Sequence, residues 1–147
     1  MLFLLKPNMN SKPSLRTIKS DLAPLQHFWV VVYGSYTTMS YTSRSDLDIA
    51  VLTRISDPAK NKKKWSDLLG KFSQEYDIKV FELLPLEVKA NIIKNYEVVF
   101  GDQLDISEYF YHFRKLWDDS KHRYYENQFS TVAEKMKALG MYGLLQK

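Results

Sequence analysis

Apolar positions divide the first two thirds of the chain into short runs separated by polar or proline-containing breaks. Runs of this length, rich in β-branched and aromatic residues, predict strands. We expect them at 28–33, 47–53, 77–82 and, more briefly, 97–100. Helical spacing fills the intervals between the strands. It predicts helices from the cap Ser14 to Asp21, from the cap Asp57 to about Gln74, and from near Pro85 to about Asn95.

The last third of the chain has a different pattern. From Asp105 to about Leu139 the apolar residues recur at helical spacing, with Glu108 as a capping-box partner and Gly140 as the expected stop. Only part of so long a helix can lie on a small domain. Its aromatic residues therefore need a further surface, which is the chain's own core, a second copy of the chain or a protein partner. They are Trp117, Tyr124, Tyr125 and Phe129.

These elements together predict an α/β (α+β) fold with a small mixed β-sheet, helices mainly on one face, and a long C-terminal helix. We expect residues 1–13 to be a flexible lead, 14–102 to form one domain, and 103–147 to be a helical extension that packs on the domain or on a partner.

Candidate chemistry lies around the first two strands. Asp46 and Asp48 begin the second strand and project from the same side of it, since successive side chains alternate. Two adjacent carboxylates repel each other unless a cation sits between them, and oxygen ligands suit Mg²⁺ or Mn²⁺. Gly34 and Ser35 end the preceding strand, where a glycine lets the backbone approach a phosphate and the serine adds an N–H and a hydroxyl. In the third strand, Asp77 alternates with apolar residues.

The Gly-Ser pair, followed after ten residues by Asp-x-Asp and by an acid in a third strand, resembles the minimal nucleotidyltransferase family of the DNA polymerase β-like superfamily. The resemblance implies a nucleotidyltransferase fold, Mg²⁺ or Mn²⁺ as cofactor and ATP as substrate. It also implies that Asp46 and Asp48 bind the metal that holds the phosphates, and that Asp77 completes the metal triad and serves the acceptor hydroxyl. Gly34 and Ser35 would hold the β- and γ-phosphates.

The chain departs from the family just after this pair. Members commonly carry an arginine and a second glycine there, whereas this chain has Tyr36, Thr37, Thr38 and Met39. Arg44 is either a substitute cation or a solvated loop residue. Small family members are similar to antitoxins encoded beside HEPN toxins, some of which transfer AMP to a tyrosine of the toxin. We therefore expect AMP transfer to a HEPN-type partner. The alternatives are a non-catalytic binding antitoxin and a transferase for a small molecule such as an aminoglycoside.

Composition narrows these expectations. The chain has 147 residues, a formal net charge of +4 and no cysteine, which excludes disulfides, thiolate metal sites and thiol catalysis. The positive charge allows an acidic partner and leaves nucleic acid open, although the lysines at 60 and 62–64 are typical of a solvated helix face. No apolar run has membrane length, so we expect a cytoplasmic protein with no membrane partner. The sequence leaves a homo-oligomer open.

Overall fold

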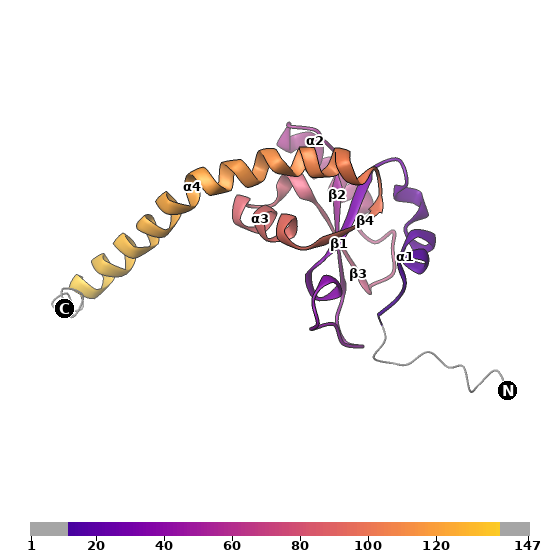
Figure 1. The fold of residues 1–147 in the computed structure, drawn as a ribbon, viewed down its shortest axis with the longest axis horizontal. Coiled ribbons are helices and arrows are strands. Elements are labelled where there is room, and N and C mark those ends of the chain that lie inside the picture. Colours follow the sequence, from indigo (N-terminus) through magenta and orange to yellow (C-terminus); the bar gives the residue numbers. More distant parts are fainter. Residues whose placement is uncertain (1–11, 139–147) are drawn as a thin grey trace.

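A single mixed sheet forms the centre of the protein, whose computed structural model describes residues 12–138 (Figure 1). The strand order is β3-β2-β1-β4, with β1 antiparallel to both β2 and β4 and with β2 parallel to β3. The strands are β1 (Trp29–Tyr33), β2 (Leu47–Leu52), β3 (Tyr76–Val80) and β4 (Tyr96–Phe100). The predicted α/β class and all four predicted strands are confirmed. Most of the expected lead at 1–13, namely residues 1–11, and the expected stop at Gly140 lie outside the described residues.

The helices are those predicted from the sequence, with one correction at the end of α2 and one at the start of α4. They are α1 (Leu15–Asp21), α2 (Pro58–Leu68), α3 (Leu86–Lys94) and α4 (Gln103–Ala138). As expected, the side chains of Ser14 and Asp57 cap α1 and α2 by accepting backbone N–H bonds at 3.2 and 3.0 Å. The first correction is that α2 ends at Leu68 rather than near Gln74, because Leu69 is extended and Gly70 has a φ of +76°.

The second correction concerns the start of α4. Asp102, and not Asp105, caps this helix, since its Oδ1 accepts the backbone N–H groups of Leu104 and Asp105 at 2.9 and 3.0 Å. A carboxylate at this position satisfies amides that have no partner within the helix. The long C-terminal helix itself is confirmed.

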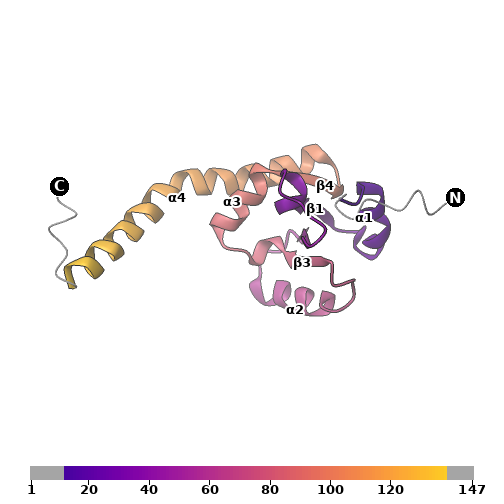
Figure 2. The ribbon, with the colours of Figure 1, turned by 90° about the horizontal axis from the view of Figure 1, so that it is seen from below.

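Helices cover both faces of the sheet, rather than mainly one as expected. On one face α1 contributes Ile18 and Leu22 to a core cluster, and α2 adds Leu68 at its edge. On the other face α3 contributes Ile92 and α4 contributes Phe110 to a second cluster. Figure 2 shows α3 on one side of the strands and α1 on the other. The physical reason is that consecutive residues of β1 and β2 are apolar and buried, so both faces of these central strands need a cover.

Only the first half of α4 packs on the domain. Ile106 and Phe110 are buried there, and the ring of Phe110 lies 4.9 Å from that of Phe81. The second half continues past the end of α3 and away from the sheet (Figures 1 and 2). The side chains of Tyr124, Tyr125 and Phe129 lie outside the described residues. Within residues 12–138, no helix combines the length and the hydrophobicity that crossing a bilayer would need.

The carboxylate of Glu82 ties the sheet to α4. It accepts the backbone N–H groups of Thr53 and Arg54, both at 3.0 Å, and the hydroxyl of Tyr109 at 2.6 Å. Burial, followed by the hydrogen bond to Glu82, raises the pKa of Tyr109 above the ordinary value of a phenol. One side chain therefore joins the loop after β2 to the helix that covers the sheet.

We expect Tyr109→Phe to lower the free energy of unfolding by about 1.5–3 kcal/mol, the typical size of a hydrogen bond to a charged group. Because the pKa of Tyr109 is raised on folding, its contribution is complete below the ordinary phenol pKa of about 10 and is lost as the pH rises past that value toward the folded-state pKa. Urea unfolding at pH 7 and above pH 10 measures both effects. The control, Tyr111→Phe, alters an exposed tyrosine of the same helix and should change stability by less than about 0.5 kcal/mol.

Candidate active site

Three polar side chains lie in one row across the sheet, on the face that α3 and α4 cover. Tyr33 ends β1 and is paired in register with Asp48 of β2, which is paired in turn with Asp77 of β3. Residues paired directly across neighbouring strands have Cβ atoms about 5 Å apart and share one face. Asp48 therefore lies between a phenol and a second carboxylate.

Gly34 brings the backbone into direct contact with Asp48. Its φ is +71°, and a Cβ added to it would overlap the carboxylate of Asp48. No other residue type fits this position without moving the aspartate, because a side chain is strained at that φ and also lacks space. Gly34 is thus required because its backbone lies against the carboxylate of Asp48. It is located at the turn that follows β1.

The turn itself is the short 3₁₀ helix η3 (Gly34–Thr37). Ser35 is half-buried in it, and its hydroxyl makes no hydrogen bond with any other residue between 12 and 138. The hydroxyl of Thr37 donates to the carbonyl of Gly34 at 3.0 Å and to that of Asn95, just after α3, at 3.2 Å. This contact fixes the turn against the end of α3.

Tyr36, which directly follows Gly34 and Ser35, serves the core. Its side chain is 3% exposed and belongs to the cluster beneath α1, and its hydroxyl donates to the carbonyl of Pro13 at 2.8 Å. Lys12 also reaches this turn, donating to the carbonyl of Tyr36 at 2.8 Å. Tyr36 therefore anchors the segment before α1 to the turn. Arg44 is exposed in the loop that leads to β2.

The electrostatics of the row are unfavourable to a negative charge at its centre. Burial raises the pKa of Asp48, the carboxylates of Asp77 and Asp46 raise it further, and Lys79 lowers it. Lys79 forms an ion pair with Asp77, with 3.6 Å between Nζ and Oδ2 and with both side chains about half exposed. The ammonium group of Lys79 thus offsets part of the negative charge of Asp77 and Asp48.

The donor chemistry of the row fits a divalent cation, although the three predicted ligands are not gathered. Asp48 and Asp77 face each other across adjacent strands, while Asp46 is exposed just before β2 and acts on Asp48 electrostatically. In the described residues, no group of three or more acidic or histidine side chains is arranged to hold a metal ion. The structure therefore brings two of the predicted ligands together and leaves the third at the edge.

Sequence reasoning missed Tyr33. Burial raises its pKa first, and the charges of Asp48 and then Asp77 raise it further, so the phenol stays neutral beside the two carboxylates. The signal was available, since Tyr33 directly precedes Gly34 and the antiparallel pairing of the first two strands sets it against Asp48. What the sequence does not give is the register of that pairing.

Comparisons with known proteins identify the family to which this chain belongs. The family model described as polymerase beta, nucleotidyltransferase matches residues 26–105, which include all four strands and the whole row. A relative from Methanocaldococcus jannaschii, named "Putative protein adenylyltransferase MJ1547", is 47% identical over 109 residues, covering 74% of this chain and 84% of its own.

Solved structures share the fold at low sequence identity. One, described as a toxin-antitoxin with AMP-PNP, has a TM-score of 0.55 at 15% identity and covers 80% of this chain and 98% of its own. Another, described as a tri-AMPylated Shewanella oneidensis HEPN toxin in complex with MNT antitoxin, has a TM-score of 0.50 at 15% identity, covering 78% and 99%. With its sheet and glycine turn matched over more than half of its length, the chain is a nucleotidyltransferase of the polymerase β family.

Proposed function

We propose that this nucleotidyltransferase transfers AMP from ATP to a tyrosine of a HEPN-type protein and serves as the antitoxin of that protein. The observation that carries the proposal is the facing pair Asp48 and Asp77 beside the backbone of Gly34. Two likenesses support it. The relative named as a protein adenylyltransferase is 47% identical, and a solved structure of the same fold is described as an AMPylated HEPN toxin with its MNT antitoxin.

The nucleotide side of the site is formed by the turn and by β2. Gly34 and Ser35 offer backbone N–H groups and a hydroxyl to the β- and γ-phosphates of ATP. Asp46 and Asp48 would hold Mg²⁺ or Mn²⁺, with Asp77 as a further ligand. When bound, the ion neutralises phosphate charge and lowers the pKa of the acceptor hydroxyl. Binding of the cation also offsets the repulsion that raises the pKa of Asp48.

The acceptor side of the site is formed by Asp77. The acceptor oxygen bonds to the α-phosphorus of ATP, the bond from that phosphorus to its bridging oxygen breaks, and pyrophosphate leaves. The proton of the hydroxyl passes to the carboxylate of Asp77. Its neighbour Lys79 remains within 3.6 Å and can offset part of the charge at this stage.

Helix α4 provides a surface for the protein acceptor. Its second half leaves the domain, and Val132 is 48% exposed there. Leu116, nearer the domain, is 45% exposed on the same helix. A helix that presents exposed apolar side chains is typical of a docking surface. Among the charged residues that line the hollows beside α4, four cations outnumber two carboxylates, which does not favour a polycationic small molecule such as an aminoglycoside.

The function itself is tested by mass. After incubation with ATP and Mg²⁺, we expect the intact mass of a HEPN-type protein encoded beside this chain to rise by one or more AMP units, located on tyrosine by peptide mapping. ATP whose α,β-bridging oxygen is replaced by a methylene group is the control, since AMP cannot be released from it. A tight complex without a mass gain would instead favour the non-catalytic antitoxin.

Metal-dependent ATP binding should depend on the carboxylates of β2. We expect the Asp46→Asn, Asp48→Asn double variant to lose measurable binding of Mg²⁺–ATP in calorimetry while keeping the melting temperature, because it removes carboxylate repulsion rather than a core contact. The double variant Asp67→Asn, Asp119→Asn makes the same charge change at exposed helical positions and should bind as the wild type does. Unchanged affinity in the first variant would refute the assignment of these ligands.

Asp77 should matter for turnover more than for nucleotide binding. We expect Asp77→Asn to reduce the rate of AMP transfer by at least ~100-fold, the scale of losing a positioned base, with little change in ATP affinity. Single-turnover transfer and calorimetry on the same preparation measure the two quantities separately. Transfer at the wild-type rate would mean that Asp77 has only a structural role.

A further inference from the structure

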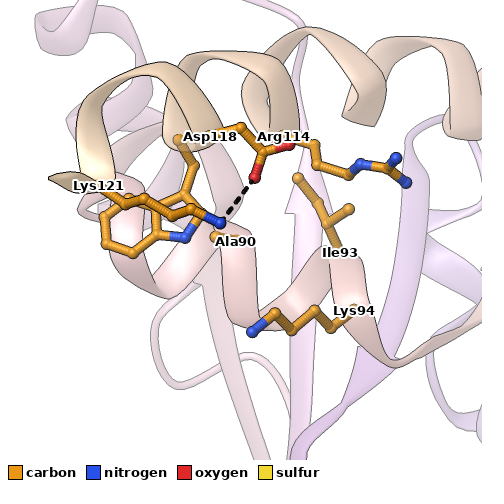
Figure 3. Close-up of a pocket in the computed structure, with 7 residues that line it drawn as sticks. Ala90, Ile93, Lys94, Arg114, Asp118 and Lys121 are labelled. Carbon is orange, nitrogen blue, oxygen red and sulfur yellow. Dashed lines mark hydrogen bonds and ion pairs between the residues drawn. The ribbon is translucent and has the colours of Figure 1, made fainter.

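A groove between α3 and α4 lies outside the row of acids and has no role in the mechanism above. Of two hollows beside these helices, of about 680 and 420 Å³, the larger forms the groove, and Trp117 lines both. In the larger one, α3 contributes Ala90, Ile93 and Lys94, and α4 contributes Arg114 and Lys121 as well as Trp117 (Figure 3). The smaller hollow is lined by Arg123, which lies half a turn around α4 from Arg114 and is not part of the groove.

The groove carries an excess of positive charge. Its cations are Lys94, Arg114 and Lys121, and its carboxylate is Asp118. Lys121 is paired with Asp118 at 3.5 Å, the contact drawn in Figure 3. Lys94 and Arg114 make no ion pair with any residue in the described part of the chain. Complementarity therefore calls for an anionic occupant.

The shape of the groove favours an extended polypeptide. Arg114 and Lys121 are seven residues apart on one helix, which places them on the same side of α4 and about 10 Å apart along its axis. An extended peptide covers that span with about three residues. Between the cations lie Ala90, Ile93 and Trp117, which offer apolar contact to the chain. A single polyphosphate would need converging donors, whereas these cations are spread along the groove.

One end of the groove lies against the active site. Lys94 precedes Asn95, whose carbonyl accepts the hydroxyl of Thr37 in the same turn as Gly34. Ile93, which lines the larger hollow, packs against the same core cluster as Tyr33. Groove and acids therefore share one face of the sheet. A peptide in the groove has a short path to the row of acids.

We propose that the α3–α4 groove binds an acidic segment of the acceptor polypeptide, through the cations Lys94, Arg114 and Lys121, and directs it toward Asp48 and Asp77. This inference rests on the proposed function in that the acceptor is a protein, and it adds where and through which chemistry that protein is held.

The test measures binding without ATP, so that it does not depend on turnover. The probe is a fluorescein-labelled random copolymer of glutamate and tyrosine, followed by fluorescence anisotropy at low salt. We expect Lys94→Glu, Arg114→Glu to weaken binding by at least ~10-fold, since each exposed charge pair contributes up to about 1 kcal/mol and reversal adds repulsion. The matched control, Lys62→Glu, Lys63→Glu, makes the same charge change on α2, on the other face, and should bind as the wild type does.

Melting and Mg²⁺–ATP calorimetry show whether the reversed variant is folded, and Lys94→Gln, Arg114→Gln provides a milder second variant. Equal losses in the groove and α2 variants, or no loss in either groove variant, would overturn the proposal. So would tighter binding of a single-stranded oligonucleotide that the groove variants abolish, because that result would identify a nucleic-acid groove. Groove-dependent binding without any AMP transfer would contradict the proposed function alone, and transfer unaffected by the groove variants would contradict the groove alone.

Discussion

The carboxylate of Asp48 at the centre of the sheet is the constraint on which the rest of the site depends. It lies between Tyr33 and Asp77 and against the backbone of Gly34, where burial and a neighbouring negative charge both disfavour ionisation. A core built for stability alone would place an apolar residue here. Within the chain, Lys79 offsets part of this charge through its ion pair with Asp77, and the cation of the proposed function would offset more of it.

The surroundings hold this charged row in a fixed geometry. The positive φ of Gly34 and the contact between Thr37 and Asn95 fix the turn, and Glu82 joins the loop after β2 to α4 through Tyr109. Apolar clusters on both faces then fill the space around the central strands. Catalysis by positioning and charge neutralisation needs this rigidity, because small displacements of the reacting groups are costly.

In the proposed function, this arrangement separates the two substrates. The turn and β2 would face the nucleotide, while α3 and α4 form a positively charged groove on the same face of the sheet. Tyr36 is buried under α1, where it anchors the segment that precedes this helix.

The sequence alone determined the strands, the caps Ser14 and Asp57, and the residues Gly34, Asp48 and Asp77, because alternation and turn chemistry are local properties. Tertiary structure decided what depends on contacts between distant segments. Strand register set Tyr33 beside Asp48 and left Asp46 at the edge, and buried runs on both faces of β1 and β2 drew helices to each side. The groove exists only because α3 and α4, separate in the sequence, pack side by side, and no local pattern encodes that pairing.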